Sequence, residues 1–142
     1  MSILKPGLEE RYKRVKQSLA DDEMRFGREP GSVFLLPVSK TFGINALEEA
    51  VKCGMRAFGE NYVQEGCEKI EYFKKQHPDL EITWHFIGHL QSNKTRPVAE
   101  HFDWVQTVAR LKIAQRLSEQ RPADMPPLNV LIEVHISDEE SK

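Results

Sequence analysis

The sequence predicts an α/β fold built on a parallel β-sheet, and three observations support this class. Short apolar runs typical of strands alternate with segments of helical periodicity along the 142 residues. Short loops join them, as expected for βα units with right-handed crossovers. The first apolar run, Val33–Val38, has the length and composition of a buried parallel strand.

The first half of the chain contains three predicted helices and two predicted strands. A helix from Leu8 to about Phe26 is expected because apolar side chains recur at helical spacing, and Gly27 ends it. After the strand Val33–Val38, turn residues and glycines set the limits of the next elements. We expect these elements to be a helix at Ala46–Cys53, a strand at Arg56–Glu60 and a helix at Tyr62–Lys75.

The second half repeats the same order. A His-Pro-Asp break precedes an apolar third strand, and a proline-rich connection leads into the last one. The expected strands are Glu81–Ile87, Phe102–Thr107 and Leu128–Ile136, and the expected helices are Lys94–His101 and Arg110–Gln120. No change of composition marks a domain boundary, so we expect residues 1–142 to form a single domain.

Five strands leave two architectures open. They are too few for a closed eight-stranded barrel, which takes about 250 residues. The sheet is therefore either open and doubly wound, or part of a barrel. The chain stops at Ser137–Lys142, directly after the apolar fifth strand, without a helix to cover that strand. We expect such an edge to favour self-association.

Composition excludes some classes of function. The net charge is −2, which gives no electrostatic reason to expect nucleic acid or a membrane as the main partner. No apolar run is long enough to span a bilayer, and the N-terminal residues lack the core of a signal peptide. Two cysteines without an export signal are expected to be reduced thiols. These features predict a cytoplasmic protein.

Lys40 follows the first predicted strand. The carboxyl ends of parallel strands are where α/β folds gather their chemistry. There, apolar walls can free a lysine amine to attack a carbonyl carbon. An isolated lysine at a strand end is usually only solvated, so the interpretation of Lys40 depends on residues further along the chain.

Two more strand exits carry polar motifs. Gly59 and Asn61 lie at the exit of the second strand, where Asn61 can either cap the next helix or bind a ligand. In the third strand, His85 and Ile87 alternate onto one face, ahead of a bend at Gly88. We expect Lys40, Asn61 and Gly88 to lie at one rim. The sequence has no nucleotide-binding or hydrolase signature, and no set of metal ligands with suitable spacing.

Four motifs in this order resemble the pyridoxal phosphate homeostasis protein family, also called proline synthetase co-transcribed proteins. The resemblance runs from about Val33 to the last residue. The motifs are Pro37-Val38-Ser39-Lys40-Thr41, Phe58-Gly59-Glu60-Asn61-Tyr62-Val63-Gln64-Glu65, His85-Phe86-Ile87-Gly88-His89-Leu90-Gln91-Ser92-Asn93-Lys94, and Asn129-Val130-Leu131-Ile132 with Ile136-Ser137.

The resemblance implies the N-terminal five βα units of a (β/α)8 TIM barrel of the alanine racemase N-terminal type, truncated after the fifth strand. It implies pyridoxal 5′-phosphate (PLP) held as a Schiff base on Lys40, with Val38, Asn61, His85 and Ile87 near the cofactor. Members of this family look like carriers or regulators of the free cofactor pool, so the resemblance implies a role in vitamin B6 homeostasis. The full-length protein is expected to be a monomer.

Other interpretations stay open at this stage. The resemblance places the phosphate-binding loops beyond Lys142, so affinity for the cofactor is expected to be weak. Lys142 is itself a minor candidate for cofactor contact. The chain is alternatively a PLP-dependent amino-acid racemase-type enzyme, which needs a second acid or base opposite the lysine, or an inert fragment.

Overall fold

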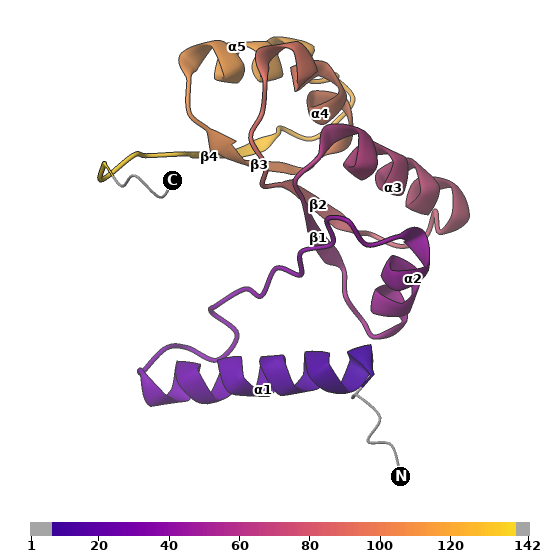
Figure 1. Cartoon of the computed structure of the whole chain (residues 1–142), viewed down its shortest axis with the longest axis vertical. Coiled ribbons are helices and arrows are strands. Elements are labelled where there is room, and N and C mark those ends of the chain that lie inside the picture. Colours follow the sequence, from indigo (N-terminus) through magenta and orange to yellow (C-terminus); the bar gives the residue numbers. More distant parts are fainter. Residues whose placement is uncertain (1–6, 139–142) are drawn as a thin grey trace. The chain divides into compact units, whose positions relative to one another are not determined.

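The computed structural model describes residues 7–138 and contains a four-stranded parallel sheet (Figure 1). Its strands lie in the order β1-β2-β3-β4, the same order as in the sequence. They are β1 (Ala57–Glu60), β2 (Thr83–Phe86), β3 (Trp104–Val108) and β4 (Asn129–Ile132). The predicted α/β class with a parallel sheet is confirmed.

Helices connect successive strands of this sheet. They are α3 (Val63–Gln76), the short 3-10 helix η1 (Ser92–Lys94) with α4 (Thr95–His101), and α5 (Leu111–Gln120). Helices α3, α4 and α5 lie on one side of the sheet (Figure 1). Helices α3, α4 and α5 each correspond to a predicted helix, with bounds that differ by at most one residue.

The core lies between these helices and the sheet. Alternate residues of each strand point to opposite faces, and one face carries large apolar side chains. The ring of Trp84 on β2 packs at a centroid distance of 5.4 Å from Phe58 on β1 and 6.0 Å from Phe73 on α3. Phe86 packs edge-on against Phe102 at 5.4 Å. These four phenylalanines and Trp84 are buried and fix the helix layer on this face of the sheet.

The described residues divide into two compact units, residues 7–37 with 42–56 and residues 38–41 with 57–138. The first unit holds α1 (Leu8–Arg25) and α2 (Ile44–Lys52). In this unit, the carboxylate of Glu23 accepts N–H groups of Gly31 (3.2 Å) and Val33 (2.9 Å), and these bonds lower the pKa of Glu23. They fix the turn that follows α1.

The predicted buried strand at Val33–Val38 is wrong in its extent. Only Val38 bridges the sheet, in parallel with Gly59 of β1, and Val38 is 46% exposed. Two physical reasons account for this. Gly59 is the third of only four residues in β1, so few residues before Val38 have a partner. Pro37 also has no N–H group to donate.

The last predicted strand, Leu128–Ile136, is also shorter than expected, since β4 ends at Ile132. Strand β3 ends at Val108, whose carbonyl accepts the N–H of Glu133 at 2.9 Å. Residues further along therefore have no neighbouring strand with which to pair. None of the helices within residues 7–138 is both long and apolar enough to cross a bilayer.

Candidate functional site

Lys40 lies at the carboxyl end of the sheet, two residues beyond the bridge between Val38 and Gly59. The N–H of Ser39 donates to the carbonyl of Gly59 at 2.9 Å, which anchors the backbone directly before Lys40. Side chains alternate along extended backbone, so Lys40 shares the face of Val38 while Ser39 points the opposite way. Ser39 is buried and the Lys40 side chain is exposed.

The strand register brings the other predicted residues to the same rim. Gly59 pairs with His85, and Ile87 continues the pairing through its N–H, which donates to the carbonyl of Glu60 at 2.8 Å. By the same alternation, Asn61 lies two residues beyond Gly59, and Ile87 two residues beyond His85. The expected common rim for Lys40, Asn61 and Gly88 is confirmed. Their contacts with a cofactor stay a prediction.

Close backbone packing fixes the loop after β2. A Cβ atom on Gly88 would lie 2.1 Å from the carbonyl oxygen of Asn61, a distance that no side chain can adopt without displacing the backbone. The hydroxyl of Thr107 donates to the carbonyl of Gly88 at 2.6 Å. The exits of β1, β2 and β3 are therefore tied together at this rim.

Asn61 has an unused hydrogen-bond acceptor. Its Oδ1 atom is buried and has no partner among the described residues. The alternative that Asn61 caps the following helix is wrong, because the N-cap residue of α3 is Tyr62 and no side chain caps it. Buried acceptors are normally paired, so this atom is available to a ligand.

His85 lies on the face of the sheet opposite to the helices. Its ring stacks on Trp104 at a centroid distance of 5.5 Å, and Gln106 Nε2 lies 3.0 Å from its Nδ1. An amide nitrogen donates, so this bond favours a neutral ring protonated at Nε2. Burial lowers the pKa of His85, and the carboxylate of Asp103 opposes that shift. His85 is thus a hydrogen-bonded, neutral member of the rim layer.

Sequence reasoning missed the partners of His85. Trp104 and Gln106 alternate within the predicted strand Phe102–Thr107, which would have placed both on one face.

Sequence reasoning also missed a buried ion cluster behind Lys40. Lys69 Nζ lies 2.9 Å from Glu60 Oε2 and 2.7 Å from Glu65 Oε1.

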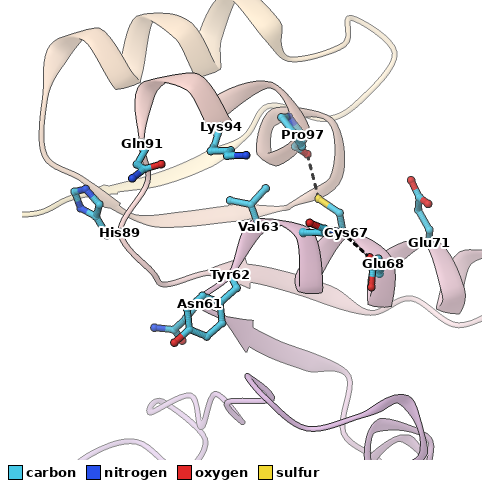
Figure 2. A pocket seen from close by; sticks show the side chains of 11 residues that line it. Asn61, Tyr62, Val63, Cys67, Glu68, Glu71, His89, Gln91, Lys94 and Pro97 are labelled. Carbon is cyan, nitrogen blue, oxygen red and sulfur yellow. Dashed lines mark hydrogen bonds between the residues drawn. The ribbon is translucent and has the colours of Figure 1, made fainter.

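A cavity of about 540 Å³ opens beside the rim, between the start of α3 and the segment around η1 (Figure 2). Asn61 and Tyr62 line it on one side, and His89 and Lys94 line it on the other. Burial, with help from the charge of Glu71, raises the pKa of the Cys67 thiol in its wall to about 11. This thiol is therefore not a nucleophile at neutral pH.

Lys142, the minor candidate for cofactor contact, lies outside the described residues. Within residues 7–138, no cluster of three or more His, Cys, Asp or Glu side chains is arranged to hold a metal ion.

No protein-family model matches the chain. The pyridoxal phosphate homeostasis protein of Vibrio cholerae is 56% identical over 135 residues, which make up 95% of this chain and 57% of the relative. The chain is related to the pyridoxal phosphate homeostasis proteins. The resemblance predicted from the four motifs is thus confirmed. The chain spans about half the length of the curated relatives it matches.

Two solved structures resemble the chain in fold. A crystal structure of an unknown protein from Bifidobacterium adolescentis superposes with a TM-score of 0.81 over 99% of this chain and 62% of its own, at 33% identity. The structure of PipY of Synechococcus elongatus PCC7942, solved with PLP bound, superposes with a TM-score of 0.60. The match covers 75% of this chain and 47% of PipY, at 40% identity. The chain is thus similar in fold to solved structures, one of which was determined with PLP bound.

Proposed function

We propose that this chain is part of a PLP-binding protein of vitamin B6 homeostasis, with the cofactor held on Lys40 as a Schiff base. One observation carries the proposal: the exposed amine of Lys40 lies at a rim where a buried acceptor, Asn61 Oδ1, has no partner among the described residues. The names of the relatives and the PLP-bound PipY structure support it.

The residues present fit this cofactor. PLP supplies an aldehyde, with which a lysine amine condenses to form a C=N bond while the carbonyl oxygen leaves as water. The exposed side chain of Lys40 provides that amine. Asn61 Oδ1 would accept a hydrogen bond from a donor on the ligand. The family resemblance assigns the phosphate contacts to residues after Lys142.

The other predicted residues would shape the site. Val38 and Ile87 present apolar side chains on the same face of the sheet as Lys40. Ile87 lies level with Lys40, and Val38 lies one residue pair deeper. Both side chains would exclude water from one side of the ligand. The neutral ring of His85 adds no charge to compete with the amine. These roles need no second catalytic acid or base, which is why we propose a carrier and not a racemase.

We further propose that residues 1–142 form a single domain, the first five βα units of a (β/α)8 barrel of the alanine racemase N-terminal type. Strands in sequential order with α3, α4 and α5 on one side of the sheet support this architecture. A doubly wound sheet instead reverses its strand order and carries helices on both faces. A role in the cofactor pool also supports a cytoplasmic location.

A spectroscopic titration tests the proposed function. Adding PLP to the chain should produce the absorbance band of a protein-bound imine, and Lys40→Ala should abolish it. Lys94→Ala is the matched control, because Lys94 is also an exposed lysine near this rim. A band of equal size in Lys40→Ala would refute the assignment. Racemisation of alanine or serine by the PLP-loaded chain would instead indicate an enzyme.

A further inference from the structure

A buried ion cluster contacts the backbone on both sides of Lys40. Lys69 Nζ donates to the carbonyl of Ser39, the residue before Lys40, at 2.8 Å. Glu65 Oε1 accepts the N–H of Thr41, the residue after Lys40, at 2.6 Å. Lys69 and Glu65 themselves form an ion pair at 2.7 Å. Two neighbouring side chains of α3 thus hold the peptide groups that flank Lys40.

Two members of the cluster, Lys69 and Glu60, are buried, and Lys69 makes several bonds. The side chains of Lys69 and Glu60 are 5% and 0% exposed, and they pair at 2.9 Å. The Ser39 hydroxyl also donates to Glu60 Oε2. Lys69 Nζ has three oxygen acceptors, on Ser39, Glu60 and Glu65, whereas Glu60 Oε1 is buried and has no partner among the described residues. The three bonds of Lys69 hold the Ser39 carbonyl against α3.

The backbone at Thr41 needs such support. Its φ of 65° lies in the left-handed region, which a β-branched residue rarely adopts. A conformation of this kind persists only where the surroundings impose it, and such residues cluster at functional sites. The bond from the Thr41 N–H to Glu65 is the contact that holds the turn directly after Lys40.

We propose that Lys69 and Glu65 are positioning residues that set the direction of the Lys40 side chain toward the rim. They do not contact the ligand. They act through the backbone of Ser39 and Thr41. This inference rests on the proposed role of Lys40.

The test compares how fast PLP forms a borohydride-trappable adduct on Lys40 in the chain and its variants. Substituting Lys69 alone would leave Glu60 buried without its cation, so the main variant is Glu65→Ala, whose side chain is 29% exposed. Glu68→Ala is the control, because Glu68 carries the same charge on the same helix and, within residues 7–138, its side chain bonds only Gln64 of α3. Glu65→Gln retains an acceptor for the Thr41 N–H. A double variant, Glu60→Gln/Lys69→Met, removes both buried charges together.

We expect Glu65→Ala and the double variant to slow adduct formation on Lys40 by about tenfold or more, while Glu68→Ala and Glu65→Gln keep the original rate. Without PLP, amide hydrogen exchange at Thr41 should become faster in Glu65→Ala but not in Glu68→Ala. Equal rates for Glu65→Ala and Glu68→Ala would overturn the positioning role and leave the proposed function intact. No adduct on Lys40 in the unmodified chain would overturn both.

Discussion

The imidazole of His85 is stacked on the indole of Trp104, with ring centroids 5.5 Å apart and ring planes within 9° of parallel. The two residues are also register partners on β2 and β3. This pair lies on the face of the sheet opposite to α3, α4 and α5, one residue pair below the rim of Lys40. Protonation of His85 would place a charge in this partly buried layer.

Stability should therefore fall in mild acid through His85. Burial lowers its pKa in the folded chain below the ordinary value of 6.5. Between the pKa of His85 in the folded chain and its pKa in the unfolded chain, the unfolded chain binds more protons at this residue. The stability that neutral His85 provides is therefore complete above about pH 6.5 and is lost as the pH falls toward the folded pKa. Urea unfolding from pH 7 to pH 5 should show that His85 lowers the free energy of unfolding by less than about 1.4 kcal/mol for each pH unit. His85→Gln should flatten the slope, whereas the exposed His89→Gln should not.

The buried pair of Lys69 and Glu60 should be costly to break from one side. Lys69→Met leaves the carboxylate of Glu60, which is fully buried, without its cation, and should lower the free energy of unfolding by about 3–5 kcal/mol. Glu60→Gln/Lys69→Met removes both charges and should be clearly more stable than Lys69→Met. Denaturant unfolding measures both variants. Equal stability of the single and double variants would show that the charge of Glu60 does not matter.

Gly88 should tolerate no side chain. In Gly88→Ala the new methyl group would lie 2.1 Å from the carbonyl oxygen of Asn61, so the loop after β2 must move. We expect a loss of about 1–3 kcal/mol in unfolding free energy, together with weaker binding at the rim. Gly43→Ala is the control, because a Cβ atom there meets nothing within 4 Å. Thermal unfolding measures both variants. An equal loss of stability in Gly88→Ala and Gly43→Ala would show that the close contact at Gly88 does not matter.

Strand β4 should promote self-association of the 142-residue chain. Val130, Leu131 and Ile132 are all exposed along this edge, which offers apolar surface and unpaired backbone groups to a second chain. Light scattering should detect oligomers at micromolar concentration, and Ile132→Lys should reduce them. A monodisperse monomer with ordinary, cooperative unfolding would show that the exposed edge is harmless.

Much of the fold followed from local patterns, because the central residues of each strand and helix carry the apolar periodicity that packing requires. The segment Val33–Pro37 failed this reasoning: an apolar run becomes a strand only where a neighbour offers partners, and β1 is too short to do so. The rim was predictable because parallel strands end on one side of a sheet. The cluster of Lys69 and Glu60 was not, since it joins α3 to β1 and depends on tertiary packing.

Peptide mapping of the borohydride-reduced complex shows directly whether PLP binds covalently to Lys40, as we propose. We expect a pyridoxyl-phosphate mass on the peptide that contains Lys40, and no comparable modification of Lys69 or Lys94. Modification spread evenly over the exposed lysines, or confined to a lysine other than Lys40, would contradict it.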